Sequence, residues 1–459
     1  MKTHIYTGVE GVNHPSEALC SCDTPGVENQ ALRQFYATYG QSNGLFYMGH
    51  ASVLAVFGGK RILFDPVVLS KPYGDSWAFF PPQIQDPSVF EVDAVVISHI
   101  HQDHYDLQFI KALVGKAKIV VIGGRPSFLK DLVDNDVKGL CVIDPEVVTE
   151  IFDGVSIFGV LHETNGIDSS AIVFNDKFCV YHGNDNYLQP SSLRKFTQIR
   201  PEIDVACIPY AYVHWYPFLL EHDKHEATAI AQEGDRLVRL YMDDCLNSIR
   251  VLKPRVMIPF GANLLLNHGG LYSAINMAVR TPVEFCEYAN SHAADLADLV
   301  KPMLAGDYCS VVDGVLNVVI ERNFDGETYR RSAQKFLAGV RPVQGDGAHG
   351  ATDPQVFLET LNYRLQAFTA PESHIVRVDL QDAGGTSKLE IDCAAREAHW
   401  VQTYNEGIDY HHFKLDSVSS SAWLRGGRLE EAIGTRRFTL RRVPNSYSKS
   451  ILRLVSTVL

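Results

Sequence analysis

Four side chains that can bind metal ions fall within a short stretch directly after the apolar run 95–97. They are His99, His101, Asp103 and His104. Neutral imidazole suits zinc and iron, and a carboxylate adds the charge needed to hold a second divalent ion beside the first. In an extended or turning segment His99 and His101 point the same way, while Asp103 and His104 continue around the turn. The spacing therefore predicts a metal site at a strand end, with Asp103 also placed to orient or deprotonate a water molecule.

This H-x-H-x-D-H pattern resembles the signature of the metallo-β-lactamase superfamily. The resemblance implies an α/β fold, a metallo-β-lactamase αββα sandwich with its metals on loops at one edge. Upstream, we expect a strand over 44–56, a glycine turn, and a second strand that ends in Asp65-Pro66. The resemblance implies that Asp65 braces the metal loop, since such carboxylates fix the orientation of ligand histidines. The alternative is a simple strand-terminating Asp-Pro turn. We expect His50 to support the ligands in the same way.

The resemblance also implies ligands at the ends of later strands. The apolar run 155–161 delivers His162, the expected third histidine of the first metal site. A hairpin over 171–181 then leads into His182 and Asp185. Asp185 matches the aspartate that bridges both ions, although an asparagine is inserted before it. His182 is either a ligand or a core histidine, and we favour the core.

The last expected ligand is missing. The strand 253–259 should be followed by a histidine within two residues, but the chain has Gly261, and the next histidine is His268. We expect the second ion to be absent, more open, or held by His268. Together with Gly49-His50-Ala51-Ser52, this departure resembles the catalytic half of the CMP-N-acetylneuraminate hydroxylase family, over roughly residues 44–320. The chain has no C-x-H…C-x-x-H pair, so we expect no Rieske cluster.

Two enzymatic functions follow from this pattern. The favoured one is a non-haem diiron oxygenase that acts on a small polar metabolite, consumes O2 and takes electrons from an external donor. The alternative is a dinuclear zinc or manganese hydrolase of a phosphodiester, ester or amide. Either needs two divalent metal ions and a small-molecule substrate. A non-enzymatic metal-binding scaffold is a third, less favoured class.

The segment after the strand 204–210 is expected to shape the substrate pocket. Residues 211–218 are crowded with aromatic side chains, which either line a small-molecule pocket or cap the core. Three histidines follow within twelve residues, and we take His214 and His225 as candidate catalytic residues that carry protons. The stretch 226–252 reads as a long amphipathic helix with a packing role only.

Composition limits the choice of partners. The 459 residues include 41 basic and 54 acidic ones, a net charge of −13, so we expect no nucleic acid and no anionic membrane as partners. No apolar run approaches the length of a membrane span, and the first residues do not open an apolar signal segment. The nine cysteines are scattered, which favours reduced thiols in the cytoplasm.

We expect three regions along the chain. Residues 1–43 form an N-terminal extension, 44–340 the catalytic domain, and 350–459 an accessory domain after the glycine-rich linker 345–350. The accessory region resembles a sterol-carrier-protein domain, a smaller α+β domain of strands, a helix, another strand and a terminal helix. We expect a lid or a homodimer contact that adds nothing to the chemistry, since none of its histidines follows a strand as the metal motifs do.

Overall fold

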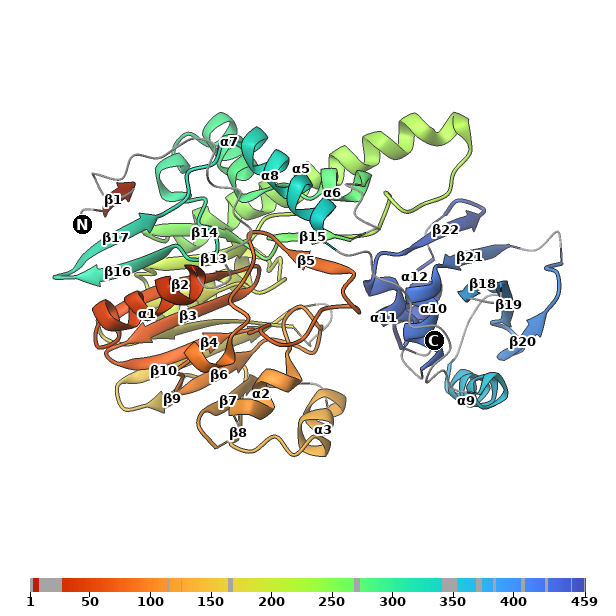
Figure 1. The fold of residues 1–459 in the computed structure, drawn as a ribbon, viewed down its shortest axis with the longest axis horizontal. Coiled ribbons are helices and arrows are strands. Elements are labelled where there is room, and N and C mark those ends of the chain that lie inside the picture. Colours follow the sequence, from red (N-terminus) through yellow and green to blue (C-terminus); the bar gives the residue numbers. More distant parts are fainter. Residues whose placement is uncertain are drawn as a thin grey trace.

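The computed structural model describes residues 3–7, 27–113, 115–124, 126–163, 168–267, 273–340, 353–368, 374–382, 385–405, 409–425, 428–446, 448–457 and 459. Figure 1 shows a larger layered part, coloured red to teal, beside a smaller blue part formed by the C-terminal residues. Within the described residues the strands form two large sheets, a two-stranded sheet and a five-stranded C-terminal sheet.

The first large sheet contains nine strands among the described residues. In spatial order they are β1 (Thr3–Thr7), β17 (Val315–Ile320), β16 (Tyr308–Val312), β2 (Asn43–Gly49), β3 (Ser52–Phe57), β4 (Lys60–Phe64), β6 (Ala94–Ile97), β7 (Lys118–Ile122) and β8 (Leu140–Ile143). Strands β4, β6, β7 and β8 run parallel. Their carboxyl ends therefore lie at one edge, where loops of α/β proteins gather their functional groups.

The second large sheet faces the first and contains six strands among the described residues. They are β14 (Val256–Phe260), β13 (Val205–Pro209), β12 (Cys179–His182), β11 (Ser169–Phe174), β10 (Val155–Leu161) and β9 (Thr149–Phe152). Strands β12, β13 and β14 are parallel, so their carboxyl ends also share one edge. A small antiparallel pair, β5 (Trp77–Phe79) with β15 (Leu264–Leu266), lies beside the sandwich.

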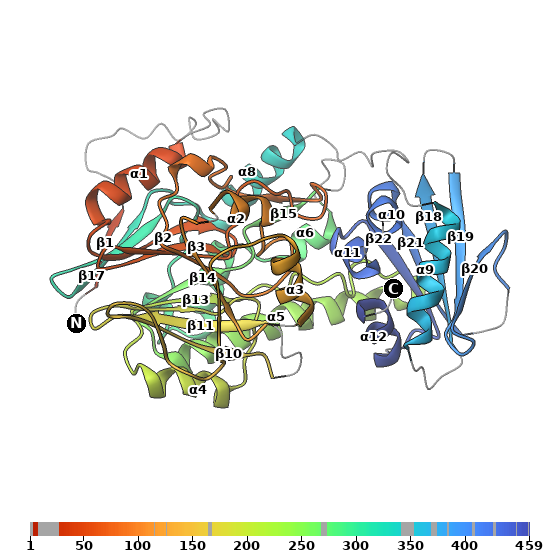
Figure 2. The same cartoon turned by 90° about the horizontal axis from the view of Figure 1, so that it is seen from below.

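Helices cover the outer faces of both large sheets, as Figure 2 shows with α1 above and α4 and α5 below. The helices of this part are α1 (Val27–Tyr39), α2 (Leu107–Leu113), α3 (Pro126–Asp134), α4 (Pro190–Ile199), α5 (Ala227–Leu252), α6 (Ala274–Ala278), α7 (Pro282–His292) and α8 (Gly326–Gly339). The fold is thus the αββα sandwich expected from the sequence, with a smaller α+β part at its C-terminal end.

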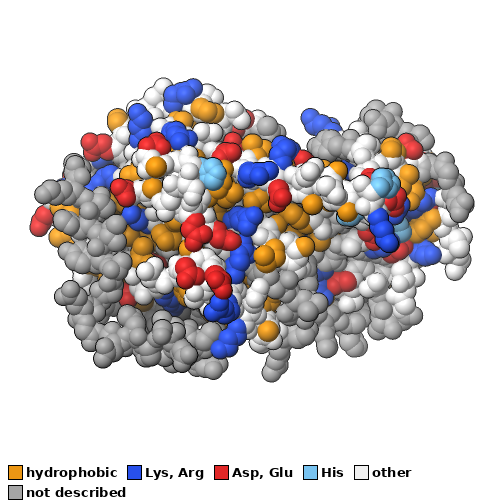
Figure 3. Space-filling view, turned by 90° about the horizontal axis from the view of Figure 1, so that it is seen from above, with side chains coloured by type: hydrophobic (Ala, Val, Ile, Leu, Met, Phe, Trp, Pro, Cys, Tyr) orange, Lys and Arg blue, Asp and Glu red, His pale blue; other side chains and the backbone are white. Residues whose placement is uncertain are grey.

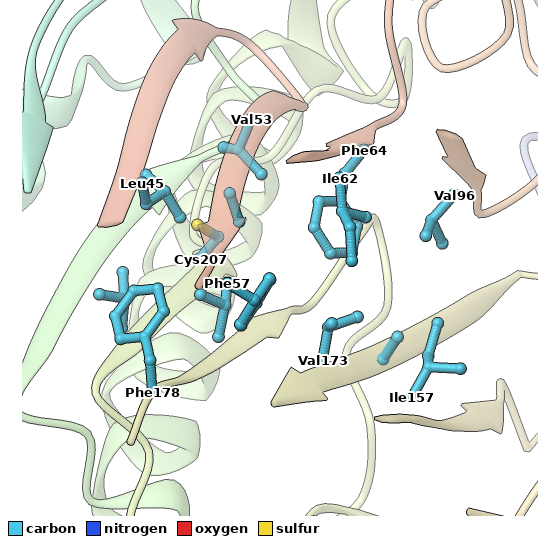
Figure 4. Close-up of a cluster of buried hydrophobic side chains, with 14 of the residues drawn as sticks. Leu45, Val53, Phe57, Ile62, Phe64, Val96, Ile157, Val173, Phe178 and Cys207 are labelled. Atoms are coloured by element: carbon cyan, nitrogen blue, oxygen red, sulfur yellow. The ribbon is translucent and has the colours of Figure 1, made fainter. Parts of the chain in front are cut away.

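The core between the two sheets is filled by apolar side chains from both inner faces (Figure 4). Ile62 and Phe64 of β4 point into it, whereas Leu63 between them packs under the helices of the first layer. Because both faces of the sheet are covered, its strands are continuously apolar rather than alternating. This explains why runs such as 94–97 and 118–122 read as buried strands.

The expected single strand over 44–56 is wrong. The chain folds back at His50 and Ala51, so that β2 and β3 form an antiparallel hairpin. Gly49 and His50 both have positive φ, 107° and 50°, which a continuous strand does not contain. The consequence is that the His50 side chain leaves a turn at the sheet edge.

The other strand and helix predictions around the motifs are confirmed. The metal motif follows β6, the run 155–161 is β10, and β11 and β12 form the predicted hairpin. The long helix after 226 is α5, and the strand before Gly261 is β14. Each of these segments combines a clear hydrophobic pattern with a turn signal at its end.

The C-terminal part is a five-stranded sheet with helices. Its elements are α9 (Pro354–Gln366), β18 (Ile375–Asp382), β19 (Gly385–Asp392), β20 (Glu397–Val401), β21 (Tyr410–Leu415), α10 (Ser417–Leu424), α11 (Leu429–Gly434), β22 (Phe438–Val443) and α12 (Lys449–Thr457). The order strands, helices, strand, helix is the one expected, while the sterol-carrier resemblance stays a prediction. The linker 345–350 lies outside the described residues.

The C-terminal sheet is joined to the sandwich through the loop before α5. Leu220 forms a parallel bridge with Leu440 of β22, and the Glu221 carboxylate accepts hydrogen bonds from Lys414 Nζ at 2.8 Å and from Thr439 Oγ1 at 2.6 Å. Leu220 is buried in the same apolar cluster as the C-terminal core. The two parts therefore share packing as well as backbone contacts.

Among the described helices, none is long and apolar enough to cross a membrane. On the face shown in Figure 3, basic and acidic side chains are interspersed, and no broad basic surface is present there.

Gly159 in β10 gives a direct test of the packing between the sheets. A Cβ at this position would lie 2.3 Å from Ile122 Cδ1 of β7, and Ile122 is itself buried. We expect Gly159→Ala to lower the free energy of unfolding by about 1–3 kcal/mol, measured by urea denaturation. The control is Gly339→Ala in α8, where no atom lies within 4 Å of the added Cβ. Equal stability of the two variants would contradict this packing.

Candidate metal centre

The metal motif lies on the loop that leaves β6. His99, Asp103 and His104 are buried, whereas His101 is exposed. The backbone N–H of His104 donates to the carbonyl of His101 at 2.9 Å, which turns the loop back toward the sandwich. His99 Nε2 lies 2.7 Å from His101 Nδ1, so these two imidazoles converge as the spacing predicted.

Asp65, at the end of β4, fixes the neighbouring loop. Its carboxylate accepts hydrogen bonds from Ser98 N at 2.8 Å and from Ser98 Oγ at 2.6 Å. The same carboxylate lies 2.9 Å from His104 Nδ1. Strands β4 and β6 are adjacent and parallel, which places both ends at the same edge. Asp65 is fully buried and braces the loop, rather than only ending a strand.

The orientation of His104 is the best test of whether the site suits a metal. Because Asp65 engages Nδ1, Nε2 of His104 is the nitrogen that faces the centre. It lies 3.3 Å from Asp103 Oδ2 and 3.2 Å from Asp185 Oδ2, yet it is buried without a hydrogen bond of acceptable geometry. A buried imidazole nitrogen converging with two carboxylates, without bonding either, fits a divalent cation.

His50 joins this group from the β2–β3 turn. Its Nε2 lies 3.1 Å from Asp103 Oδ2, and its Nδ1 is buried without a hydrogen-bond partner. Potential ligand atoms of His50, Asp103 and His104 lie within 4.8 Å of one another, as do those of His99, His104 and Asp185. The two groups share His104, whose Nε2 can bind one ion, so the groups overlap at this residue.

Gly261 lies beside the same centre. It follows β14, its N–H donates to the carbonyl of His50 at 3.0 Å, and a Cβ there would be 3.8 Å from Asp185 Oδ1. The backbone position that should carry the last histidine is therefore next to His50. An imidazole from the β2–β3 turn, that of His50, thus lies near the end of β14.

The charges of the centre are strongly coupled. Burial alone would raise the pKa of Asp103. The neighbouring His104 and His50 have a larger, opposite effect, so the pKa of Asp103 lies well below its usual range. Burial together with the charges of His104 and His101 lowers the pKa of His99 to about 4. Asp103 is thus ionised and His99 neutral at pH 7, whereas the neighbouring Asp185 and Asp103 raise the pKa of His104 well above its usual value, so a metal ion would have to displace the proton of His104.

The remaining predicted residues lie in different places. His182 is buried, stacks on Phe64 with 4.9 Å between ring centroids, and is 3.0 Å from the carbonyl of Ala51. It packs in the core under the His50 turn. His162 directly follows β10 and is half-buried, and it is not part of the two ligand groups found among the described residues. His268 lies outside the described residues.

The two candidate proton carriers lie on different segments. His214 is exposed, its Nε2 is 3.1 Å from the Tyr241 hydroxyl, and Asp185 influences its charge. His225 is exposed on a 3₁₀ turn, η2 (Lys224–Glu226), in a separate group with Asp223 and Glu226. This surface group of Asp223, His225 and Glu226 caps a helix.

Sequence reasoning missed the contribution of the loop between β4 and β5. The Tyr73 hydroxyl donates to Asp103 Oδ1 at 3.2 Å. Asp106, just after the motif, accepts three backbone N–H groups from residues 68–70 and so shapes this loop. The acidic residue after H-x-H-x-D-H was the available signal, and nothing in the sequence linked Tyr73 to it.

With this geometry established, comparison with known proteins identifies the fold family. Residues 44–260 match the model described as a β-lactamase superfamily domain. This part of the chain, which contains the His/Asp groups described above, is therefore similar to that superfamily.

Curated relatives are similar to part of the chain. A UPF0173 protein of Pyrococcus furiosus is 25% identical over 50% of this chain and 84% of its own length. A UPF0173 metal-dependent hydrolase of Pyrococcus horikoshii is 28% identical over 36% of this chain and 70% of its own. A putative Rieske 2Fe-2S iron–sulfur protein of Mycolicibacterium smegmatis is 26% identical over 46% of this chain and 42% of its own.

Solved structures with similar folds include enzymes of both chemical classes. Igni18, a metallo hydrolase from Ignicoccus hospitalis, is 20% identical with a TM-score of 0.41, over 58% of this chain and 97% of its own. The diiron β-hydroxylase CmlA from Streptomyces venezuelae is 13% identical with a TM-score of 0.35, over 54% of this chain and 52% of its own. These similarities concern the fold.

The role of Asp65 gives a prediction about stability. Asp65→Ala removes the shared acceptor of Ser98 N, Ser98 Oγ and His104 Nδ1, leaving buried polar groups unsatisfied. We expect the free energy of unfolding of the metal-free protein to fall by about 3 kcal/mol, measured by urea denaturation. Asp153→Ala, at an exposed turn, is the control and should change it by less than about 0.5 kcal/mol. Equal losses in the two variants would refute a bracing role.

Proposed function

We propose that this protein is a hydrolase of a small molecule that uses two divalent metal ions, zinc or manganese. The proposed ligands include the members of the two convergent groups, His50, His99, Asp103, His104 and Asp185. The exposed histidine of the motif, His101, and the histidine after β10, His162, complete the set. The observation that carries the proposal is the His50 imidazole beside Asp103 and His104.

His50 alters the balance between the two enzymatic classes. The oxygenase expectation depended on the histidine missing after β14, which would leave one ion with an incomplete ligand set. Because His50 comes within 3.1 Å of Asp103 Oδ2 and its backbone pairs with Gly261, we infer that it takes over that role. A complete imidazole and carboxylate set around two ions suits hydrolysis.

The residues around the centre suggest how the reaction is organised. Two divalent ions supply a nucleophile, because they lower the pKa of bound water, and they polarise the substrate. Asp103 is positioned by Tyr73 and His50, so its carboxylate stays in a fixed orientation. Asp185 has a side chain that is 42% exposed, which places the open side of the centre at this residue.

His214 is the proposed proton carrier at the open side. Its side chain is exposed, and its contact with the Tyr241 hydroxyl holds the ring in place. A neutral imidazole near the pocket can accept the proton released by the attacking water.

An iron-dependent oxygenase is the second candidate. It is favoured by the relative from Mycolicibacterium smegmatis, whose name is that of an iron–sulfur protein. In this case the same histidines and aspartates hold iron, O2 is a substrate, and an external donor supplies electrons. The two candidates share one site and differ in the metal and the reaction.

We also propose that the chain divides into a metal-binding unit ending near residue 340 and an accessory unit over 350–459. Leu32 and Phe35 of α1 are buried against the first sheet, so residues 27–43 are placed with the metal-binding unit. Homodimer formation through the accessory unit stays a prediction.

The proposed ligands predict a set of metal contents. His101→Ala and Asp103→Ala are expected to abolish metal retention while the fold persists, because both side chains lie on an edge loop. His50→Gln is expected to lower the metal content by about half, since one of two ions loses a ligand. Elemental analysis of dialysed protein measures this, and circular dichroism verifies folding.

His268→Ala is the matched comparison for His50→Gln, because it removes the other histidine that is able to replace the missing ligand. We expect it to leave the metal content unchanged. Loss of metal in His268→Ala with full occupancy in His50→Gln would show that His268 is the ligand and would refute the role of His50.

The choice of reaction predicts the metal and the need for oxygen. We expect protein produced without added metal to contain zinc or manganese, and to hydrolyse a phosphodiester, ester or amide substrate equally well with and without air. Elemental analysis and anaerobic assays of such substrates measure this. Bound iron with an optical spectrum that changes on exposure to O2, and no anaerobic hydrolysis, would establish the oxygenase instead.

A further inference from the structure

Arg436 brings a positive charge from the C-terminal part to the metal centre. It lies in the turn between α11 and β22, with a positive φ of 58°. This backbone conformation is rare for residues with a side chain, and it persists only where surrounding contacts enforce it. The contacts that hold Arg436 in this conformation also fix the position of its guanidinium.

The turn that carries Arg436 is pressed against the loop between β4 and β5. Trp77 Nε1 donates to the carbonyl of Gly434 at 2.9 Å. A Cβ at Gly434 would lie 2.3 Å from Tyr73 Cε1, so only glycine fits this approach. Arg437 also crosses to the sandwich, donating from Nη1 to the carbonyl of Asn267 at 2.8 Å. The position of Arg436 relative to the sandwich is therefore well fixed.

The guanidinium is only partly satisfied. Its Nη1 donates to the carbonyl of Ile433 and its Nη2 to the carbonyl of Val213, both at 3.2 Å. Its Nε is buried without a partner, and no ion pair joins it to a carboxylate of the described residues. Five N–H groups belong to a guanidinium, so three stay available to an acceptor. A largely desolvated cation without a counter-charge is costly unless an anion binds there.

The surroundings of Arg436 connect it to the metal centre. The guanidinium carbon lies 5.8 Å from the ring centre of Trp77. Asp103, Tyr73 and Tyr212 are near enough to influence its charge, and Tyr73 itself donates to Asp103 at 3.2 Å. His214, the proposed proton carrier, feels the charges of both Arg436 and Asp185. Aromatic rings and a cation thus lie beside the Asp103 side of the centre.

We propose that Arg436 binds an oxyanion, a carboxylate or a phosphate group, on the substrate of the adjacent metal centre. That the bound oxyanion is part of a substrate rests on the proposed function; that Arg436 binds an oxyanion does not. The planar guanidinium suits such a group because it forms two parallel hydrogen bonds to two oxygens. The C-terminal part then completes the pocket and selects anionic substrates over neutral ones.

The test measures binding of two simple oxyanions, inorganic phosphate and acetate, to the full-length protein by isothermal titration calorimetry. We expect Arg436→Gln to weaken the preferred anion by about tenfold or more. Arg436→Lys, which keeps the charge but not the planar fork, is expected to lose less. Preference for phosphate or for acetate identifies the group that the substrate carries.

Arg441→Gln is the matched control, because Arg441 lies on the next strand, is exposed, and pairs with Asp223. It should bind both anions as the unchanged protein does. Thermal unfolding of Arg436→Gln and Arg436→Lys separates anion binding from the packing role of the side chain. If Arg436 had a structural role alone, both variants would unfold at a similarly lowered temperature. The lysine variant would then bind the anions no better than the glutamine variant.

Titrations with metal-loaded and with EDTA-treated protein distinguish the two proposals. If the protein takes up no metal but its affinity for phosphate or acetate still depends on Arg436, the anion site is supported and the metallohydrolase proposal fails. If Arg436→Gln binds both anions as tightly as the unchanged protein, or the unchanged protein binds neither, the role of Arg436 is refuted while metal content still tests the function.

Discussion

The buried carboxylate of Asp65 is the interaction on which the arrangement of the centre depends. It joins the ends of two parallel strands, since it directly follows β4 and accepts hydrogen bonds from Ser98, which directly follows β6. By engaging His104 Nδ1 at 2.9 Å it leaves Nε2 to face Asp103 and Asp185. A carboxylate buried this deeply is stable only because every contact is a hydrogen bond. The position of each later ligand is defined relative to His104.

The parts of the site that could be predicted from the sequence are those close together in the chain or at strand ends. His99 to His104 form a local motif, and Asp65 and Asp185 each follow a strand whose apolar pattern is clear. The hairpin at His50 was missed because residues 45–48 and 53–56 are apolar, so the two runs suggest one continuous strand. The indications of the reversal were Gly49, whose positive φ of 107° begins the turn, and the polar His50 and Ser52 beside it.

Long-range contributions could not be predicted in the same way. Tyr73 and Arg436 are 363 positions apart in the chain, and they come together only because Gly434 allows the α11–β22 turn to approach the β4–β5 loop. The prediction for the C-terminal part rested on histidines that follow strands, and an arginine in a turn carries no such signal. The expectation that this part adds nothing to the chemistry stays a prediction, which the proposed role of Arg436 opposes.

The charge of the proposed centre explains why an arginine belongs beside it. Two divalent ions bring four positive charges, against which Asp65, Asp103 and Asp185 supply three negative ones. Arg436 adds a further positive charge without a carboxylate partner among the described residues. In a partly desolvated pocket, this excess of positive charge attracts an anion more strongly than the same charges would in bulk water. The overall charge of −13 gives the rest of the molecule the opposite sign, so the attraction is confined to the pocket.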